Sequence, residues 1–237
     1  MGTGNRQLLS MDTARISAFL EPFLEQPLAP SQLDQISTYI DLLRRWNARI
    51  NLTAIRHDEE MVTRHFGESF FLARHLFPAT TACGAVGAPR VLDIGSGAGF
   101  PGLPLKIWAP GIHLTLIESN HKKAAFLREV ARTLILTDIN VISDRAESVS
   151  TQPSSPQAEF VTLRAVENFE RILPQAQALL APNGSLALLI GAAQLPLLST
   201  LTTLKWHPPI GVPKSHFRVL SISVRGESGK LMVSDKE

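Results

Sequence analysis

The run Val91–Gly102, VLDIGSGAGFPG, constrains the fold of this chain more than any other part of the sequence. It begins as a short apolar strand, breaks into glycines and then starts a helix. Glycines allow a backbone to turn tightly and to approach a ligand closely, because no Cβ blocks the approach. A second apolar strand, residues 113–117, ends on Glu118, where a carboxylate can accept hydrogen bonds from ribose hydroxyls. Together these features predict a doubly wound α/β domain that binds an adenosine-containing cofactor.

The spacing of the glycines distinguishes the possible cofactors. In the dinucleotide-binding pattern G-x-G-x-x-G, the third glycine lets the helix pack beside a pyrophosphate. Counting from Gly95, that position is Phe100, and the other glycines here are Gly97 and Gly99, with Asp93 ahead of them. The pattern D-x-G-x-G-x-G resembles motif I of the methyltransferases that use S-adenosyl-L-methionine, which implies that cofactor. The alternative is a tight turn that binds nothing, but three glycines and an acid are more than a turn requires.

Beyond Arg90, apolar strand patterns alternate with helical patterns, which predicts a mostly parallel sheet covered on both faces. No helix separates the last two strands, so they are expected to form an antiparallel hairpin at the sheet edge. This is the seven-stranded, Rossmann-like form of the class I methyltransferases. The strands are expected near 90–94, 113–118, 139–143, 159–164, 185–190, 204–207 and 217–224, and the helices near 101–109, 120–135, 169–181 and 194–203.

The sequence ahead of this domain is helical in pattern. Ser31 with Asp34 predicts a capping box at the start of one helix. A second helix is expected to begin near Asp58, where acidic residues oppose the helix dipole, and to end before Pro78. The expected organisation is a disordered leader at 1–10, a helical extension at 11–80, a linker at 80–89, the cofactor-binding domain at 86–226 and a tail at 227–237.

Composition restricts the class of protein. The chain has 237 residues, of which 44% are hydrophobic and 19% charged, with a formal net charge of +2. These values are typical of one globular domain and neither demand nor exclude nucleic acid. The single cysteine, Cys83, excludes an internal disulfide and a multi-cysteine metal site. The most apolar stretch, Leu186–Leu201, is interrupted by Gly191 and Pro196, so no membrane span is expected, and a cytoplasmic location fits these features.

Ligands of doubly wound sheets bind beyond the carboxyl ends of the strands, so the residues at those ends are the candidate site. At the third strand, Glu147 or Asp144 can accept from an adenine amino group, although acids at a helix N-terminus are an equally good reading for either. At the fourth, Arg164 ends a buried run, where a charge must find a partner. The expected cofactor-binding residues are Asp93, Gly95, Ser96, Gly97, Gly99, Phe100, Glu118, Ser119, Ala146, Glu147 and Arg164.

Arg164 is also the one candidate catalytic residue. Its guanidinium could hold the cofactor carboxylate, the backbone of a nucleic acid or a target base. The alternative is a structural salt bridge between elements. Phe100 is a candidate for shaping the substrate pocket, with a core position as the alternative reading.

Several short motifs together resemble one family, the RsmG (GidB) methyltransferases, which modify N7 of a guanosine in bacterial 16S ribosomal RNA. The resemblance spans roughly residues 40–224 and departs at Glu68, where the family usually has aspartate, and at Ile190, where it usually has lysine. The motifs are Trp46-Asn47, Asn51–Ile55, Arg64-His65, Glu68-Ser69, Asp93–Gly102, Lys122-Lys123, Phe126-Leu127, Arg145–Glu147 and Arg164-Ala165.

The resemblance implies an in-line methyl transfer without a general base, because guanine N7 already carries a free lone pair. It also implies small-subunit ribosomal RNA or the 30S particle as partner, and a monomer. The expected RNA-binding residues are Arg44, Arg45, Arg49, Asn51, Arg64, His65, Lys122 and Lys123, with solvated helix faces as the alternative for the charged ones. A methyltransferase for a small molecule or a protein, and a non-catalytic cofactor-binding module, remain as alternative functions.

Overall fold

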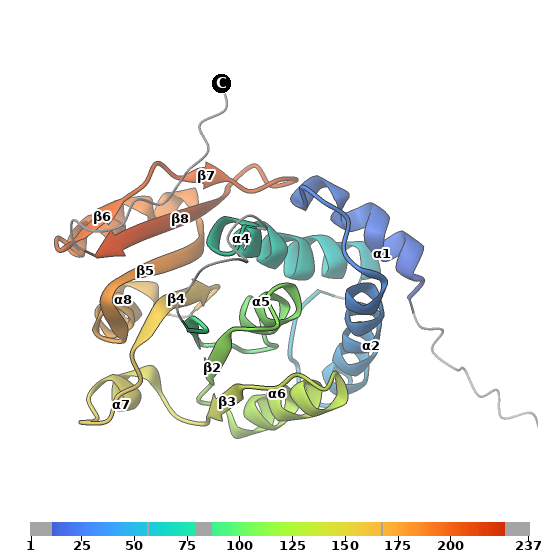
Figure 1. Ribbon diagram of the computed structural model, residues 1–237, viewed down its shortest axis with the longest axis horizontal. Coiled ribbons are helices and arrows are strands. Elements are labelled where there is room, and N and C mark those ends of the chain that lie inside the picture. Colours follow the sequence, from blue (N-terminus) through green and yellow to red (C-terminus); the bar gives the residue numbers. More distant parts are fainter. Residues whose placement is uncertain (1–10, 56, 79–86, 167, 226–237) are drawn as a thin grey trace, which may run out of the picture.

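The computed structural model describes residues 11–55, 57–78, 87–166 and 168–225, and Figure 1 shows a central sheet with helices on both faces. The strand order is β3-β2-β1-β4-β5-β8-β6, and β7 pairs with β8 beside this path. The strands are β1 (Arg90–Ile94), β2 (His113–Ile117), β3 (Ile139–Ile142), β4 (Ala158–Arg164), β5 (Leu180–Gly191), β6 (Leu204–Trp206), β7 (Ile210–Gly211) and β8 (Arg218–Arg225).

The direction of the strands confirms the predicted mostly parallel sheet. The pairs β1–β2, β1–β4, β2–β3 and β4–β5 are parallel, whereas β8 runs antiparallel to both β5 and β6. The predicted hairpin therefore lies at the edge, but β8 is inserted between β5 and β6. The two-residue strand β7 adds to the seven expected strands, and β5 begins at Leu180, five residues earlier than expected.

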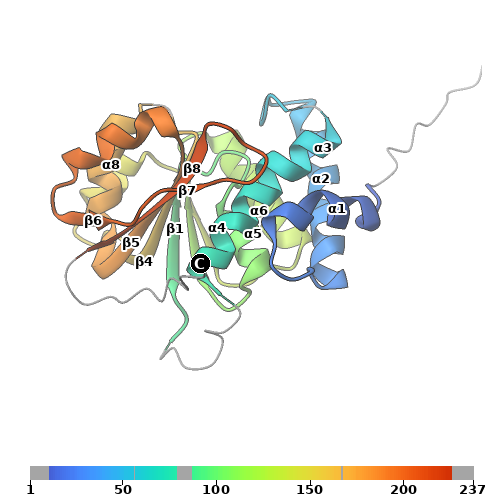
Figure 2. The same cartoon turned by 90° about the horizontal axis from the view of Figure 1, so that it is seen from above.

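Two hydrophobic cores lie on the two faces of the sheet. Figure 2 shows, from above, helices on both sides of the strands. One face is covered by the helical extension and two helices of the sheet region. The longer α-helices on this face are α1 (Thr13–Leu20), α2 (Pro30–Asn47), α4 (Glu68–Leu76), α5 (Gly102–Trp108) and α6 (His121–Thr133). The other face carries shorter helices, and these are α7 (Ala146–Ser150), α8 (Phe169–Ala178) and the 3-10 helix η4 (Ala192–Thr200). Helix α7 was not expected from the sequence.

The start of α2 corrects one sequence prediction. The helix begins at Pro30, and the side chain of Gln32 accepts a hydrogen bond from the Ala29 N–H at 2.9 Å. Proline favours the first helical position because its missing N–H would be unpaired there. The capping box predicted at Ser31 and Asp34 is therefore wrong, because Gln32 already serves this end of the helix.

The second predicted helix begins at Asp58, as expected, but it is not a uniform α-helix. Three consecutive segments follow one another, and these are α3 (Asp58–Glu60), the π-helix η2 (Met61–Gly67) and α4. The wider turn of a π-helix frequently occurs at functional sites. Helix α1 and the 3-10 turn η1 (Glu21–Phe23) precede α2 and were not anticipated.

The helical extension is fixed to the sheet by buried contacts. The apolar face of α2 shares one core with the helices and strands of the cofactor-binding region. Tyr39 of α2 donates a hydrogen bond to the carbonyl of Ala98 in the glycine loop at 2.5 Å, and Gln32 donates to the carbonyl of Ile107 at 2.9 Å. The extension therefore lies directly against the glycine loop.

The expected leader at 1–10, the tail at 227–237 and most of the expected linker lie outside the described residues. Within the described part of the chain, none of the helices combines the length and the apolar character needed to cross a membrane.

Candidate functional site

The glycine loop between β1 and α5 depends on its glycines for backbone conformation and for close packing. Gly95, Gly97 and Gly99 all have positive φ angles, at +68°, +57° and +91°, which favour glycine. A Cβ at Gly99 would overlap the hydroxyl of Tyr39, so this glycine is required by packing. A Cβ at Gly97 would have as its nearest neighbour only the Gly95 carbonyl, at 3.7 Å. Gly97 therefore borders open space, where a ligand can approach the backbone.

Asp93 stabilises this loop from its buried side. Its carboxylate is fully buried, accepts a hydrogen bond from the Thr162 hydroxyl at 2.7 Å, and lies 3.4 Å from the Gly102 nitrogen, which donates to it. Burial raises the pKa of Asp93 to about 6. The side chain holds the start of α5 against β4 and does not line the pocket described below.

Glu118, at the end of β2, holds the loop from the other side. One carboxylate oxygen accepts from the Gly97 N–H at 2.8 Å, and the other accepts from the Asn120 N–H at 2.7 Å. Each oxygen of an ionised carboxylate has two acceptor positions, so each retains one for a ligand hydroxyl. Asn120 in turn caps α6 by accepting from the N–H groups of Lys122 and Lys123.

A pocket of about 670 Å³ opens beyond the carboxyl ends of the strands, within the size range of small-molecule sites. It brings together nearly all of the expected cofactor-binding residues, and these are Gly95, Ser96, Gly97, Phe100, Glu118, Ser119, Ala146, Glu147 and Arg164. Asp93 and Gly99 are not among the residues that line the pocket. The pocket also reaches Leu52, Thr53 and His65 of the helical extension, so it has a cofactor-like side and a second side.

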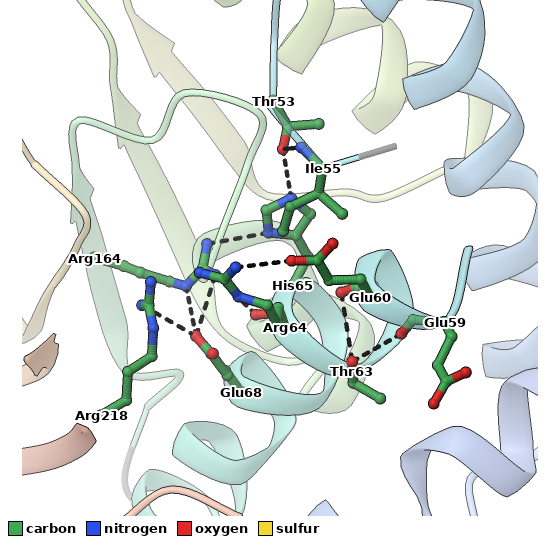
Figure 3. Close-up of polar contacts among 10 residues, drawn as sticks. All are labelled: Thr53, Ile55, Glu59, Glu60, Thr63, Arg64, His65, Glu68, Arg164 and Arg218. Atoms are coloured by element: carbon green, nitrogen blue, oxygen red, sulfur yellow. Dashed lines mark hydrogen bonds and ion pairs between the residues drawn. The ribbon is translucent and has the colours of Figure 1, made fainter. Parts of the chain in front are cut away.

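Arg164 anchors a buried ionic cluster at this second side (Figure 3). Its Nε and Nη2 donate to one carboxylate oxygen of Glu68 at 3.2 and 3.1 Å, and Nη2 also donates to the Arg64 carbonyl at 2.8 Å. Arg218 from β8 reaches the same Glu68 oxygen at 3.4 Å. With a further bond from Nη1 to His65, four of the five guanidinium N–H donors are engaged, and one has no partner among the described residues.

His65 is also buried in this cluster, with an exposed fraction of only 7%. Its Nδ1 lies 3.3 Å from Arg164 Nη1, and its Nε2 lies 2.8 Å from the Thr53 hydroxyl. Its ring stacks on Phe100 with a centroid distance of 4.5 Å. Burial, reinforced by the charge of Arg164, lowers the pKa of His65 well below its usual value. The imidazole is therefore neutral at neutral pH.

The expected RNA-binding residues divide into three groups. Arg45, Arg49, Asn51 and Lys122 are exposed. Arg44 and Arg64 are engaged in ion pairs, Arg44 with Asp41 and Asp58 and Arg64 with Glu60. His65 and Lys123 line the pocket.

The site also contains residues that the sequence reading did not select. Asn120 and Arg145 follow strand ends, so the strand-end signal applied to the others would have found them. Thr53 and Arg171 line the pocket from the extension and from α8. Arg218 carried no such signal, because it begins an antiparallel strand and reaches the cluster from the far side of β5.

Solved structures with a similar fold are methyltransferases. The putative methyltransferase yhhF of Escherichia coli matches with a TM-score of 0.53 and 16% identity, over 66% of this chain and 86% of that chain. The ribosomal protein L11 methylase of Lactobacillus delbrueckii subsp. bulgaricus matches with a TM-score of 0.52 and 16% identity, over 68% and 80% of the two chains. At this low identity, the likeness describes the fold, which is that of the class I methyltransferases.

The sequence comparisons are more specific. A family model described as rRNA small subunit methyltransferase G matches residues 32–203. The ribosomal RNA small subunit methyltransferase G of Roseiflexus castenholzii is 43% identical over 162 residues, or 65% of this chain and 66% of the relative. That of Xylella fastidiosa is 36% identical over 212 residues, or 86% of this chain and 94% of the relative. The family match covers well over half of the sequence, so this chain belongs to the rRNA small subunit methyltransferase G family, which is of the S-adenosylmethionine-dependent class.

Proposed function

We propose that this protein transfers a methyl group from S-adenosyl-L-methionine to N7 of a guanine in small-subunit (16S) ribosomal RNA. The observation that carries the proposal is the two-sided pocket. Its first side combines the glycine loop with Glu118, and its second side is formed by Arg164 and the helical extension. One ligand-binding space thus joins a cofactor-type cradle to residues of the helical extension.

The residues of the first side fit the cofactor. Glu118 keeps an acceptor position on each oxygen for the ribose hydroxyls, and the Gly97 backbone borders open space. Ala146 and Glu147 line the pocket after β3, and we expect them to contact the adenine through the backbone and the carboxylate. When bound, S-adenosyl-L-methionine supplies a methyl group on a positively charged sulfur.

The reaction needs no general base. The N7 lone pair would accept the methyl group that bound S-adenosyl-L-methionine supplies, the carbon–sulfur electron pair would stay with sulfur, and no proton would have to leave the base. The arrangement of His65 and Glu118 is compatible with this requirement, because both nitrogens of His65 are hydrogen-bonded and the two oxygens of Glu118 accept from the Gly97 and Asn120 N–H groups. Alignment of the two reacting atoms then supplies most of the catalysis, for which about 7–11 kcal/mol is attainable.

The expected partner surface is formed by exposed cations of α2, of the residues that follow it and of α6. Arg45, Arg49 and Lys122 are exposed cations that suit phosphate contacts. Sequence-specific RNA recognition usually acts on unstacked bases, so the target guanine would be turned out of its stack into the pocket. We propose that the protein acts in the cytoplasm, as a monomer, on ribosomal RNA or the 30S particle.

Isotope transfer tests this proposal. Labelled S-adenosyl-L-methionine is incubated with the protein and, in parallel, with 16S RNA, with 30S particles, and with protein and small-molecule fractions free of RNA. The modified nucleoside is then identified by mass. Label in N7-methylguanosine is the expected result. Label at another position of the RNA would refute the N7 assignment, and label only in the RNA-free fractions would favour a methyltransferase for a small molecule or protein.

A further inference from the structure

A single histidine links three separate parts of the molecule at the second side of the pocket. His65 belongs to the π-helix η2, and its ring lies between Thr53 of the extension and Arg164 at the end of β4 (Figure 3). One face of the same ring stacks on Phe100 of the glycine loop, with an interplanar angle of 12°. The residue therefore contacts the helical extension, the sheet and the glycine loop at once.

The hydrogen bonds fix where the proton of His65 lies. A guanidinium has donors but no acceptor, so His65 Nδ1 must accept from Arg164 Nη1. The proton is then on Nε2, which donates to the Thr53 hydroxyl, and this oxygen also accepts from the Ile55 N–H at 3.1 Å. Thr53 is itself held by Asn47 of α2 through two hydrogen bonds of 3.0 Å to its backbone. A continuous chain of bonds thus runs from α2 to Arg164.

Burial and the surrounding charges together keep His65 neutral. Three cations face it, Arg64 from its own helix, Arg164 from β4 and Arg218 from β8. Among the described residues, Glu68 pairs with Arg164 and Arg218, and Glu60 pairs with Arg64. The neighbours on its other sides, Thr53 and Phe100, are uncharged. A neutral imidazole adds no positive charge beside a site for a sulfonium cofactor, and it leaves Nδ1 free to accept.

We propose that His65 is a positioning residue for methyl transfer, which sets the direction of the last free N–H of Arg164 and the plane of Phe100. The proposal rests on the proposed function. Arg164 has one uncommitted donor, and the bond to His65 fixes the nitrogen that carries it. Phe100 is stacked between His65 and Tyr39, whose ring centroid is 5.4 Å away, so its plane depends on His65. Direct contact with an RNA phosphate is not favoured, because neither nitrogen of His65 is open.

Two substitutions at His65 distinguish the effect of its hydrogen bonds from the effect of its ring. His65→Phe keeps a ring for the stack on Phe100 but removes both hydrogen bonds. His65→Asn loses the ring but places an amide oxygen near the position of Nδ1, where it can accept from Arg164. His113→Phe is the matched control, because His113 is exposed at the start of β2, at the opposite end of the sheet.

The measurements are the single-turnover rate at saturating cofactor and 16S RNA, the Kd for RNA at several salt concentrations, and the Tm. His65→Phe is expected to lower the saturated rate on the order of tenfold to a hundredfold, the effect of a small misplacement of reacting groups. The RNA Kd and its salt dependence should stay within about twofold of the wild type, as for an uncharged residue without phosphate contacts. His65→Asn should retain more of the rate than His65→Phe does.

Three results would overturn the proposal. If the RNA Kd of His65→Phe were higher than that of the wild type and depended less on salt, His65 would be a direct RNA contact. A lowered Tm with an unchanged saturated rate would make its role structural only. A faster reaction by His65→Phe than by His65→Asn would show that the bond to Arg164 is unimportant.

A failure of the proposed function is recognised separately, because wild-type protein would then form no N7-methylguanosine. In that case the guanidinium NMR signals of Arg164 still test the positioning without any RNA. Slow rotation of the guanidinium is expected in the wild type and in His65→Asn, and faster rotation in His65→Phe. Identical guanidinium signals in all three proteins would refute the positioning role of His65.

Discussion

Replacing Glu118 with alanine tests the cofactor side of the pocket most directly. The substitution removes the acceptor for the ribose hydroxyls and also releases the Gly97 and Asn120 N–H groups that the carboxylate holds at 2.8 and 2.7 Å. Both released groups lie at the pocket, where water can replace the lost acceptor, so the cost to folding is limited. The main loss falls on the bound state, in which the ribose hydroxyls would lack a charged acceptor.

The magnitude follows from the value of such bonds. Losing hydrogen bonds to a charged acceptor costs about 1–3 kcal/mol. Since 1.4 kcal/mol corresponds to a tenfold change in affinity, the Kd for S-adenosyl-L-methionine should rise by about 5-fold to 150-fold. In a protein of this size, a destabilisation of 1 kcal/mol would lower the Tm by roughly 2–4 °C. A small fall in Tm together with a large rise in Kd is therefore expected.

Calorimetric titration with the cofactor and thermal unfolding provide the two measurements. Glu170→Ala is a suitable control, because Glu170 is an exposed acid in the first turn of α8 and does not line the pocket. A Glu118→Ala protein that unfolds at nearly the wild-type temperature and binds the cofactor within twofold of the wild type would refute the assignment. The glycine loop would then have to bind its ligand without the acid at the end of β2.

Four further outcomes are expected. Gly97→Val should abolish cofactor binding by calorimetry while the protein stays folded by circular dichroism, because the side chain would enter ligand space and Gly97 has φ +57°; normal binding would exclude the loop as the cradle. Replacing Arg45 and Arg49 together with alanine should flatten the salt dependence of the RNA Kd and leave the cofactor Kd alone; an unchanged slope would make them a solvated face. Arg164→Lys should lose most methyl transfer and lower the Tm, because three ammonium donors cannot replace four engaged guanidinium donors; near-wild-type transfer would end its functional role. Since the pKa of His65 is lowered in the native state, the unfolded state takes up its proton first as pH falls through about 6.5. Stability in urea should therefore decrease below that pH, and less so in His65→Phe, and identical pH profiles for the two proteins would contradict the buried neutral imidazole.

The sequence alone determined the features that depend on local pattern. Alternating strands and helices, a glycine loop after the first strand and an acid after the second are fixed by residues close together along the chain. Because parallel strands place their carboxyl ends at one edge, these local features also predicted which residues would meet. Gly95, Gly97, Glu118 and Ala146 line one pocket for this reason. The start of α2 shows where local patterns fail. Ser31 and Asp34 matched a capping box as well as any other pair, but the helix begins at Pro30 and Gln32 caps it.

Only the tertiary structure decided how the second side of the pocket is built. Glu68 and Arg164 are 96 positions apart, and Glu68 and Arg218 are 150 apart, yet all three meet at one carboxylate oxygen. No periodicity reports such a contact, because it depends on how the helical extension packs on the sheet and on the insertion of β8 beside β5. The same packing buries His65, which the sequence presented as a cation beside Arg64. Its neutrality follows from burial among arginines, and burial is a property of the assembled core and not of the residue's neighbours along the chain.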